Sequence, residues 1–277
     1  MNNEQILNNV KSGYADIVKR NTKKSFLPNI FQCCDPKEIS IDIGKKIGYS
    51  EEELKNVPED ANLGIGCGNP TALASIQKGE TILDLGSGAG FDCFLASRET
   101  GETGKVVGVD ITPEMVAQAK KNAEKGNYKN IDFKVGEIEN LPVESNTIDL
   151  IISNCVINLS NQKEQVFKEA FRVAKPKGRM MISDIILLND LPDYVKNSVE
   201  AHIACLAGAV RKENYINAIT KAGFKDISID KQAPFPLELM LNDPIAENIV
   251  RENNLTEKEI KDIANSIASI SISANKA

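Results

Sequence analysis

The sequence predicts an α/β fold in which helices cover both faces of a mostly parallel sheet. Three observations support this fold: short apolar runs alternate with helical patterns through the middle of the chain, glycines follow the first apolar run, and an acidic residue ends the second. Regular alternation of strand and helix is typical of parallel sheets, because each helix returns the chain to the start of the next strand. In such folds a ligand binds beyond the carboxyl ends of the strands.

Helices are expected before the sheet. Asn3 to Arg20 places apolar residues at roughly helical spacing, and Ser50 with Glu53 forms a capping box that begins a short second helix. A loop is expected between Pro58 and Pro70. Residues 1–62 are therefore expected to form an N-terminal helical segment.

Strands and helices are expected to alternate in the middle of the chain. The expected strands are Thr81–Leu85, Val106–Val109, Ile131–Val135, Ile148–Ser153 and Arg179–Ser183. The expected helices are Phe91–Thr100, Pro113–Lys125 and Gln162–Ala174. Thr112 followed by Pro113 is typical of a helix start, since proline is tolerated in the first turn. Residues 63–190 are expected to form the ligand-binding core.

The last part of the chain is expected to extend the sheet and to cover the substrate. Two helical patterns, a strand, a second capping box and a segment that alternates in period two follow in order: Asp193–Ala207, Lys212–Ala222, Phe224–Asp230, Thr256–Glu259 and Ile267–Ser273. We expect the final strand to be antiparallel. Residues 191–277 are expected to form an α+β extension whose helices cover the substrate.

Composition excludes several classes of function. The formal net charge of the 277 residues is −6, which argues against nucleic acid or an anionic membrane as the main partner. No apolar run approaches the ~20 residues of a membrane span, and the first residues are polar rather than a signal-peptide core. A cytoplasmic protein with reduced cysteines is therefore expected. The single histidine, His202, excludes a metal site with several histidines.

The glycine-rich segment indicates which nucleotide binds. Thr81–Gly90 reads TILDLGSGAG, and its glycines form G-x-G-x-G rather than the dinucleotide fingerprint, which needs a glycine at Phe91. Asp84 precedes these glycines, disfavours a phosphate and suits a ligand with a cationic amino or sulfonium group. Asp110 ends KVVGVD about twenty residues later, where a carboxylate accepts the ribose hydroxyls.

This pattern resembles motif I of the class I S-adenosylmethionine-dependent methyltransferases, which have a Rossmann-like sheet. The resemblance implies S-adenosylmethionine as the cofactor. It places the cofactor contacts at Asp84, Gly86, Ser87, Gly88, Gly90, Asp110, Met115, Glu137, Ile138 and Asn154. Glu137 is expected at the adenine amino group, with Ile138 and Met115 against the ring. A solvated turn carboxylate is the alternative for Glu137, and plain core packing is the alternative for Met115.

Three cysteines lie where the substrate is expected. Cys67 is bracketed by glycines in the loop before the core, Cys155 follows the fourth strand, and Cys205 lies after the fifth strand. Core packing is the alternative for each, because free cysteine often behaves as a small buried apolar residue. Cys93, inside the helix after the glycine turn, is expected to be structural. Structural zinc is disfavoured, because its ligands often come in C-x-x-C pairs and the chain has none.

The segments that contain these cysteines resemble the arsenite methyltransferases. GIGCGNPTALA, ILDLGSGAG, GEIENLP, SNCVINLS and CLAGA follow one another in this order. The resemblance implies that Cys67, Cys155 and Cys205 bind trivalent arsenic, and that Cys33 or Cys34 takes part in a disulfide relay. It also implies arsenite and methylated trivalent arsenicals as substrates, and a thiol reductant such as thioredoxin or glutathione.

The chemistry of arsenic agrees with these residue types. Trivalent arsenic is soft and prefers thiolates. Three thiolates leave one lone pair to attack the methyl carbon of a sulfonium, and no general base is needed, which agrees with a chain that has one histidine. Two alternatives remain open: a methyltransferase for another small acceptor, such as a quinone precursor, and a metalloid-binding protein without turnover.

Overall fold

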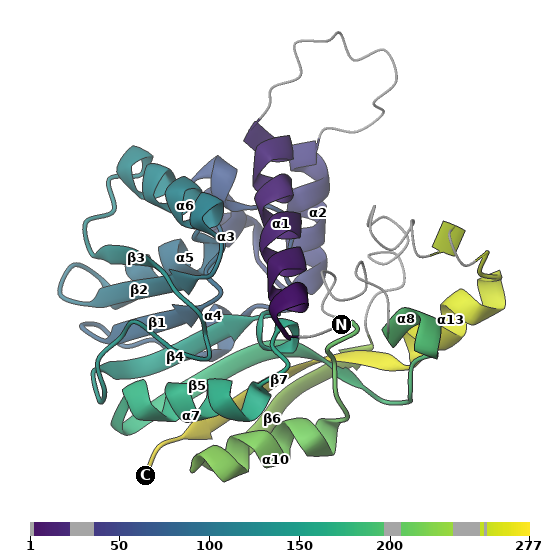
Figure 1. Cartoon of the computed structure of the whole chain (residues 1–277). Helices are drawn as coiled ribbons and strands as arrows, with labels where there is room; N and C mark the ends of the chain where they lie inside the picture. Colours follow the sequence, from purple (N-terminus) through teal and green to yellow (C-terminus); the bar gives the residue numbers. More distant parts are fainter. Residues whose placement is uncertain (1–2, 23–35, 197–205, 235–249, 252–253) are drawn as a thin grey trace, which may run out of the picture.

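A seven-stranded sheet forms the centre of the protein (Figure 1). The structure is a computed structural model and describes residues 3–22, 36–196, 206–234, 250–251 and 254–277. The strands are β1 (Thr81–Leu85), β2 (Lys105–Asp110), β3 (Ile131–Val135), β4 (Ile148–Asn154), β5 (Ala174–Leu187), β6 (Lys225–Pro234) and β7 (Ile267–Asn275). Their order across the sheet is β3-β2-β1-β4-β5-β7-β6.

The last strand, β7, runs against its neighbours. It pairs antiparallel with β5 and with β6, whereas β1 to β5 are parallel to one another. Leu83 of β1 lies opposite Val107 of β2 and Ile151 of β4, so the carboxyl ends of these three strands reach the same edge. The predicted α/β fold with an antiparallel final strand is confirmed.

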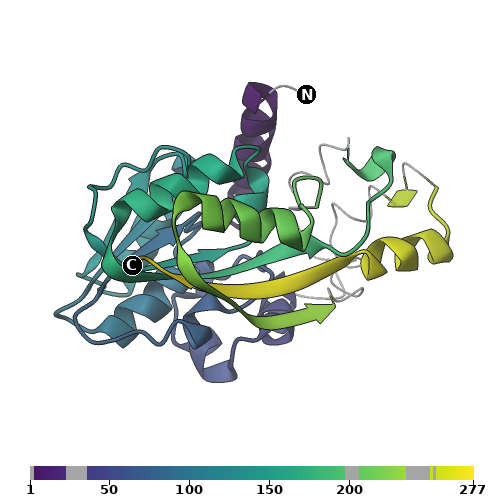
Figure 2. The same cartoon turned by 90° about the horizontal axis from the view of Figure 1, so that it is seen from below.

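Helices cover both faces of the sheet (Figures 1 and 2). The helices between the strands are α5 (Phe91–Thr100), α6 (Pro113–Lys125), α7 (Lys163–Val173) and α10 (Lys212–Ala222). Side chains alternate along a strand. Ile82 therefore packs in the cluster of Phe94 from α5, while Leu83 packs in the cluster of Phe167 from α7. Both faces are buried, as expected of parallel strands.

Several helices precede the sheet. They are α1 (Asn3–Thr22), α2 (Pro36–Ile47), α3 (Glu51–Lys55), η1 (Glu59–Ala61) and α4 (Pro70–Leu73). The predicted capping box is present, because Ser50 Oγ accepts a hydrogen bond from Glu53 N at 3.2 Å and Glu53 Oε2 accepts one from Ser50 N at 2.7 Å. The sequence did not predict α2. Across the described residues, no helix combines the length and apolar character of a membrane span.

One predicted helix, Asp193–Ala207, differs in the structure. The elements after β4 that remain to be named are η2 (Ile157–Leu159), α8 (Asp193–Lys196) and α13 (Glu257–Asn265), of which α13 begins at the predicted Thr256 capping box. Residues 197–205 lie outside the described residues, and Leu206 to Gly208 form a turn, so the predicted helical end at Ala207 was wrong. The turn lies close to η2, since a Cβ on Gly208 would overlap the Asn158 carbonyl oxygen.

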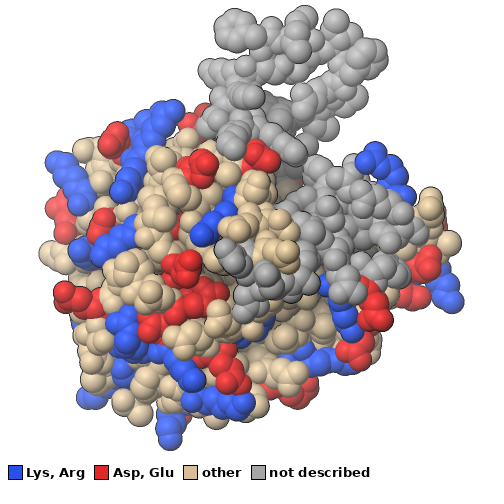
Figure 3. Space-filling view, in the orientation of Figure 1, with Lys and Arg blue, Asp and Glu red and all other residues tan. Residues whose placement is uncertain are grey.

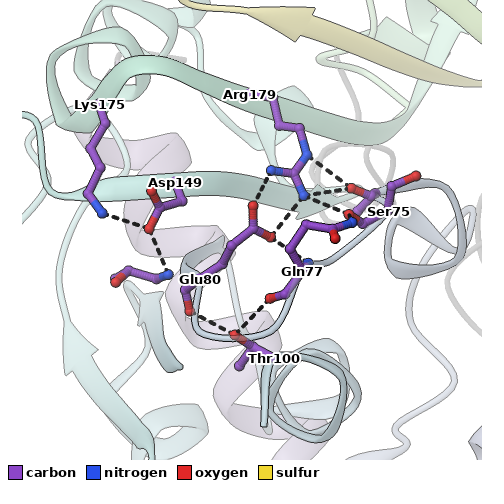
Figure 4. A network of polar contacts seen from close by, with 9 residues as sticks. Ser75, Gln77, Glu80, Thr100, Asp149, Lys175 and Arg179 are labelled. Atoms are coloured by element: carbon purple, nitrogen blue, oxygen red, sulfur yellow. Dashed lines mark hydrogen bonds and ion pairs between the residues drawn. The ribbon is translucent and has the colours of Figure 1, made fainter. Parts of the chain in front are cut away.

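A polar network holds the amino ends of the strands (Figure 4). Arg179 of β5 pairs with Glu80, which precedes β1, at 2.5 Å. Asp149 of β4 accepts hydrogen bonds from Thr81 N at 2.9 Å and from Lys175 Nζ at 2.7 Å. These contacts join β1, β4 and β5 at the edge away from their carboxyl ends, which leaves the carboxyl ends for a ligand.

Charges of both signs are interspersed on the surface. On the face shown in Figure 3, Lys and Arg alternate with Asp and Glu over the described residues and form no broad basic area there.

Candidate functional site

A cavity lies at the carboxyl ends of β1, β2 and β4. Its volume is about 1170 Å³, including space open to solvent. Its walls include Asp84, Gly86, Ser87 and Gly88 after β1, Asp110, Ile111 and Thr112 after β2, and Asn154, Cys155 and Val156 after β4. Residues of the N-terminal helices α1 and α2, such as Tyr14 and Ile47, form another part of its wall. The two sequence motifs thus meet where a parallel sheet binds its ligand.

The glycine turn shapes one wall of the cavity. Gly86 has φ +69° and Gly88 has φ +53°, a region that residues with a side chain rarely adopt. A Cβ on Gly86 would overlap the Val156 side chain, whereas a Cβ on Gly88 would meet no atom within 4 Å. Gly86 therefore allows close packing of β1 against the end of β4, and Gly88 leaves room for a ligand. Gly90, with φ +96°, caps the start of α5.

Asp110 is held in place by the backbone of two segments. Its Oδ2 accepts a hydrogen bond from Gly88 N at 2.9 Å, and its Oδ1 accepts one from Thr112 N at 2.8 Å. Burial raises the pKa of Asp110, while these two hydrogen bonds act in the opposite direction. A carboxylate has about four acceptor positions, so two remain for a ligand in the cavity.

Asp84 is buried at the end of β1. Its Oδ2 accepts a hydrogen bond from Cys93 Sγ at 3.2 Å. Burial raises the pKa of Asp84 well above its usual value, and the neighbouring carboxyl of Asp92 raises it further. Burial likewise raises the pKa of the Cys93 thiol, so this cysteine is buried and un-ionised. Crowded carboxyl groups at one cavity wall favour a cationic ligand.

Two of the expected adenine contacts lie away from the cavity wall. Ile138 lines the cavity, together with Glu139. Glu137 and Met115 are not among the described residues that line it, and Met115 is completely buried in α6. The Glu137 carbonyl oxygen accepts a hydrogen bond from Asn140 N at 3.1 Å, within a tight turn.

Asn154 connects the cavity to the loop of Cys67. Its Nδ2 contacts Gly68 O at 2.8 Å, Tyr49 Oη at 2.9 Å and Asp92 Oδ2 at 3.2 Å. Its Oδ1 accepts a hydrogen bond from Cys67 N at 3.1 Å. Tyr49 donates to Asp92 Oδ1 at 2.6 Å, which closes the network. One side chain therefore holds the backbone of this loop at Cys67 N and at Gly68 O.

Sequence reasoning missed Tyr49 and Asp92. Burial raises the pKa of Asp92 to about 6, although hydrogen bonds from Tyr49 and Asn154 lower it. The available signal was the position of Asp92 in the first turn of α5, directly after the glycine turn. Tyr49 carried no signal beyond its place before the Ser50 cap.

Cys67 and Cys155 come together beside Asp184. The sulfurs of the two cysteines and a carboxylate oxygen of Asp184 all lie within 4.8 Å of one another. Cys155 has φ +59°, and its backbone N donates to Ser183 O at 2.8 Å. Cys67 O accepts a hydrogen bond from Ser269 Oγ at 2.6 Å. Neither cysteine is in a disulfide.

The structure does not describe the remaining predicted thiols. Cys33, Cys34 and Cys205 lie outside the described residues. Leu206, the residue after Cys205, is buried in the same hydrophobic cluster as Cys67 and Cys155.

The comparisons with known proteins agree with this site. The sequence model of a methyltransferase domain family matches residues 76–223. The chain belongs to this methyltransferase family. An arsenite methyltransferase of Halobacterium salinarum is 39% identical over 197 residues, which cover 71% of this methyltransferase and 50% of the relative. An arsenite methyltransferase of Homo sapiens is 36% identical over 186 residues, which cover 64% of this chain and 49% of that protein.

Solved structures of methyltransferases have the same fold. The crystal structure of an arsenic(III) S-adenosylmethionine methyltransferase from Chlamydomonas reinhardtii superposes with a TM-score of 0.60 at 30% identity, covering 88% of this methyltransferase and 74% of that chain. A geranyl diphosphate methyltransferase shares the fold, with a TM-score of 0.63 at 17% identity. The predicted resemblance to the arsenite methyltransferases is confirmed. The chain spans about half the length of the curated relatives it matches.

Proposed function

We propose that this methyltransferase transfers methyl groups from S-adenosylmethionine to trivalent arsenic, first to arsenite and then to methylarsenite. One observation carries the proposal: the thiols of Cys67 and Cys155 lie close together, and Cys155 lines the same cavity as Asp84 and Asp110. Relatives named arsenite methyltransferases support the choice of acceptor.

The residues at the cavity fit S-adenosylmethionine. Asp110 retains acceptor positions for the two ribose hydroxyls, and Gly88 leaves open space beside it. The Oγ of Ser87 is buried and has no hydrogen-bond partner among the described residues. A cation is favoured by the buried pair Asp84 and Asp92. When bound, the cofactor supplies a methyl group on a sulfonium, which is already a good leaving group.

Cys67 and Cys155 provide two of the arsenic ligands in this proposal, and Cys205 the third. Thiolates bind soft centres more strongly than carboxylates do. With three thiolates bound, arsenic retains its lone pair, and the chain needs only to hold this lone pair in line with the methyl carbon. Asn154 holds the backbone at Cys67, and the hydrogen bond from Cys155 N to Ser183 O holds it at Cys155, so both described thiols start from fixed backbone positions. No general base is required.

Cys33, Cys34 and an external thiol complete the proposed cycle. Methyl transfer oxidises arsenic formally from the trivalent to the pentavalent state. Two enzyme thiols then return two electrons to arsenic and form a disulfide. A thiol reductant such as thioredoxin or glutathione reduces that disulfide, so that the next arsenite binds to reduced cysteines.

Arsenic speciation tests the proposal. The reduced protein is incubated with arsenite, a thiol and S-adenosylmethionine, and the arsenic species are separated. Methylated arsenic is the expected product, and it should be absent without cofactor. Protein-bound arsenite without methylation would indicate a metalloid-binding protein instead. Indifference to arsenite would indicate another small acceptor.

A further inference from the structure

Asp184 is a buried carboxyl that accepts hydrogen bonds but forms no ion pair among the described residues, although the charge of Lys163 acts on it. It is completely buried at the carboxyl-terminal part of β5. Its Oδ1 accepts hydrogen bonds from Asn158 Nδ2 and Ile185 N, each at 2.8 Å, and its Oδ2 accepts one from Tyr215 Oη at 2.8 Å. Oδ2 therefore retains an acceptor position. Buried carboxylates are normally paired with a cation or coordinate a metal.

Two thiols complete a set of three donors around this carboxyl. Cys67 Sγ, Cys155 Sγ and an Asp184 carboxylate oxygen lie within 4.8 Å of one another. Two sulfurs bound to one tetrahedral zinc ion, each at ~2.3 Å, are roughly 3.8 Å apart. The 4.8 Å limit on the separations in this cluster is compatible with such a spacing, and backbone hydrogen bonds hold Cys67 and Cys155 in place beside Asp184.

We propose that Cys67, Cys155 and Asp184 bind a thiophilic divalent cation of the zinc group, with a fourth position open to the cavity. Three protein ligands and one open position are typical of zinc sites that remain accessible, in contrast to the closed sites of structural zinc. Both thiols lose their protons on binding, and the two thiolates and one carboxylate then surround the divalent charge.

This cation site shares its thiols with the proposed arsenic site but has a different third ligand. Trivalent arsenic prefers a third sulfur, whereas a divalent cation of intermediate softness also accepts a carboxylate oxygen. The cation and arsenic therefore exclude one another. Cation binding does not depend on methyl transfer, so it is testable whether or not arsenic is the substrate.

The substitution Asp184→Asn isolates the contribution of the carboxylate. The amide oxygen can keep the hydrogen bonds from Asn158 and Ile185, while the amide nitrogen donates to the Tyr215 hydroxyl, which can also accept. We therefore expect the variant to keep the fold while it loses the negative charge. Reduced, metal-free protein is titrated with Cd²⁺, and binding is followed by calorimetry and by the absorbance of cadmium–thiolate bonds. We expect one Cd²⁺ per chain, and binding that is weaker by about tenfold or more in Asp184→Asn.

Three cysteine variants complete the test. Cys67→Ser should lose Cd²⁺ binding, whereas Cys93→Ser, whose thiol lies beside Asp84, should keep it. Cys205→Ser should also keep Cd²⁺ binding, although it is expected to lose arsenite methylation. Cd²⁺ binding and arsenite methylation are thus measured separately in this last variant, so the cation site can fail while the proposed function holds, and the reverse. Equal affinity in wild type and Asp184→Asn, or loss of binding in Cys205→Ser, would overturn the proposal.

If circular dichroism shows that Asp184→Asn does not fold, a second measurement on the wild type tests which atoms bind the cation. X-ray absorption at the cadmium edge of the wild-type complex reports the number of sulfur and oxygen ligands. Two sulfurs with oxygen in the remaining positions are expected. Three or four sulfurs would overturn the proposal.

Discussion

At the scale of single residues, the Asp110 carboxylate is the side chain of the cavity whose orientation is most clearly fixed by the protein itself. Its carboxylate is positioned by two backbone N–H groups, so its orientation does not depend on a ligand. A residue that is fixed in advance loses little conformational freedom on binding, and its hydrogen bonds therefore contribute fully to affinity.

Asp110→Ala should weaken cofactor binding and leave the fold intact. The lost interactions are hydrogen bonds to a charged group, worth roughly 1.5–3 kcal/mol, which corresponds to about a tenfold to a hundredfold loss of affinity. Isothermal titration calorimetry with S-adenosylmethionine measures this effect. Unchanged affinity would remove Asp110 from the cofactor site.

Cys155→Ser and Cys205→Ser should each abolish arsenite methylation, while Cys93→Ser should not. A serine hydroxyl is nearly isosteric with the thiol but is a poor ligand for a soft centre. Cys93 is buried beside Asp84 and is the matched control. Cofactor affinity should persist in both inactive variants. Normal turnover by Cys205→Ser would contradict a site with three thiolates.

At the scale of elements, the glycine turn between β1 and α5 sets how close the backbone lies to the cavity. Gly86 packs against Val156, whereas Gly88 faces open space. Both glycines have positive φ, but a side chain at Gly86 would meet the protein and one at Gly88 would enter open space.

The pair Gly86→Ala and Gly88→Ala should separate stability from binding. Gly86→Ala combines a left-handed backbone with overlap on Val156, and we expect it to lower the free energy of unfolding by about 2–4 kcal/mol. Gly88→Ala bears only the backbone cost of about 1–2 kcal/mol, but its methyl group enters the cavity and should weaken cofactor binding. Urea unfolding and calorimetry measure the two effects. Equal stability losses in both variants would contradict the packing role of Gly86.

Asp92, in the first turn of α5, should make stability depend on pH. Its pKa is raised from 3.8 to about 6 in the folded protein. Between these values the folded state binds more protons than the unfolded state, so this group's contribution to stability falls as the pH rises and is lowest above about pH 6. At ~1.4 kcal/mol per pKa unit the change is up to about 3 kcal/mol.

The substitution Asp92→Asn removes this titration. Relative to the variant, the wild type should be less stable at about pH 7 than at about pH 4.5, as measured by urea unfolding at both values. A difference between the two proteins that stays constant with pH would show that Asp92 has an ordinary pKa.

At the scale of the whole molecule, the N-terminal helices reach the site. Both α1 and α2, which flank residues 23–35, contribute side chains to the cavity wall, among them Tyr14 and Ile47. The chain between these helices carries Cys33 and Cys34, which lie outside the described residues.

The double substitution Cys33→Ser, Cys34→Ser should block methylation of arsenite but spare methylation of methylarsenite. Adjacent cysteines rarely bridge one another because the geometry is strained, so the expected disulfide joins one of them to an arsenic ligand. Methylarsenite needs only two thiolates and should still react. Product analysis with each substrate tests this, and full activity on arsenite would remove both cysteines from the mechanism.

Local patterns in the sequence predicted most of the sheet and the main cavity motifs. The strands and the G-x-G-x-G turn are visible because their apolar runs and glycines are contiguous. The positions of Tyr49, Asp92 and Asp184 in the site were not visible, since each acts through contacts with residues distant in the sequence. The helix predicted to reach Ala207 was wrong at its end, where the chain forms a turn that lies against Asn158, a residue distant in the sequence.

The hydrogen bond from Ser269 of β7 to Cys67 spans 202 residues. A ribosome therefore releases Cys67 long before Ser269, and the loop gains this hydrogen bond only after β7 has paired between β5 and β6. Asn154 of β4 is synthesised earlier and holds the same loop at Cys67 N. Under the proposed function, the capacity to capture a metalloid becomes complete only after β7 has been made, long after the first of its thiols.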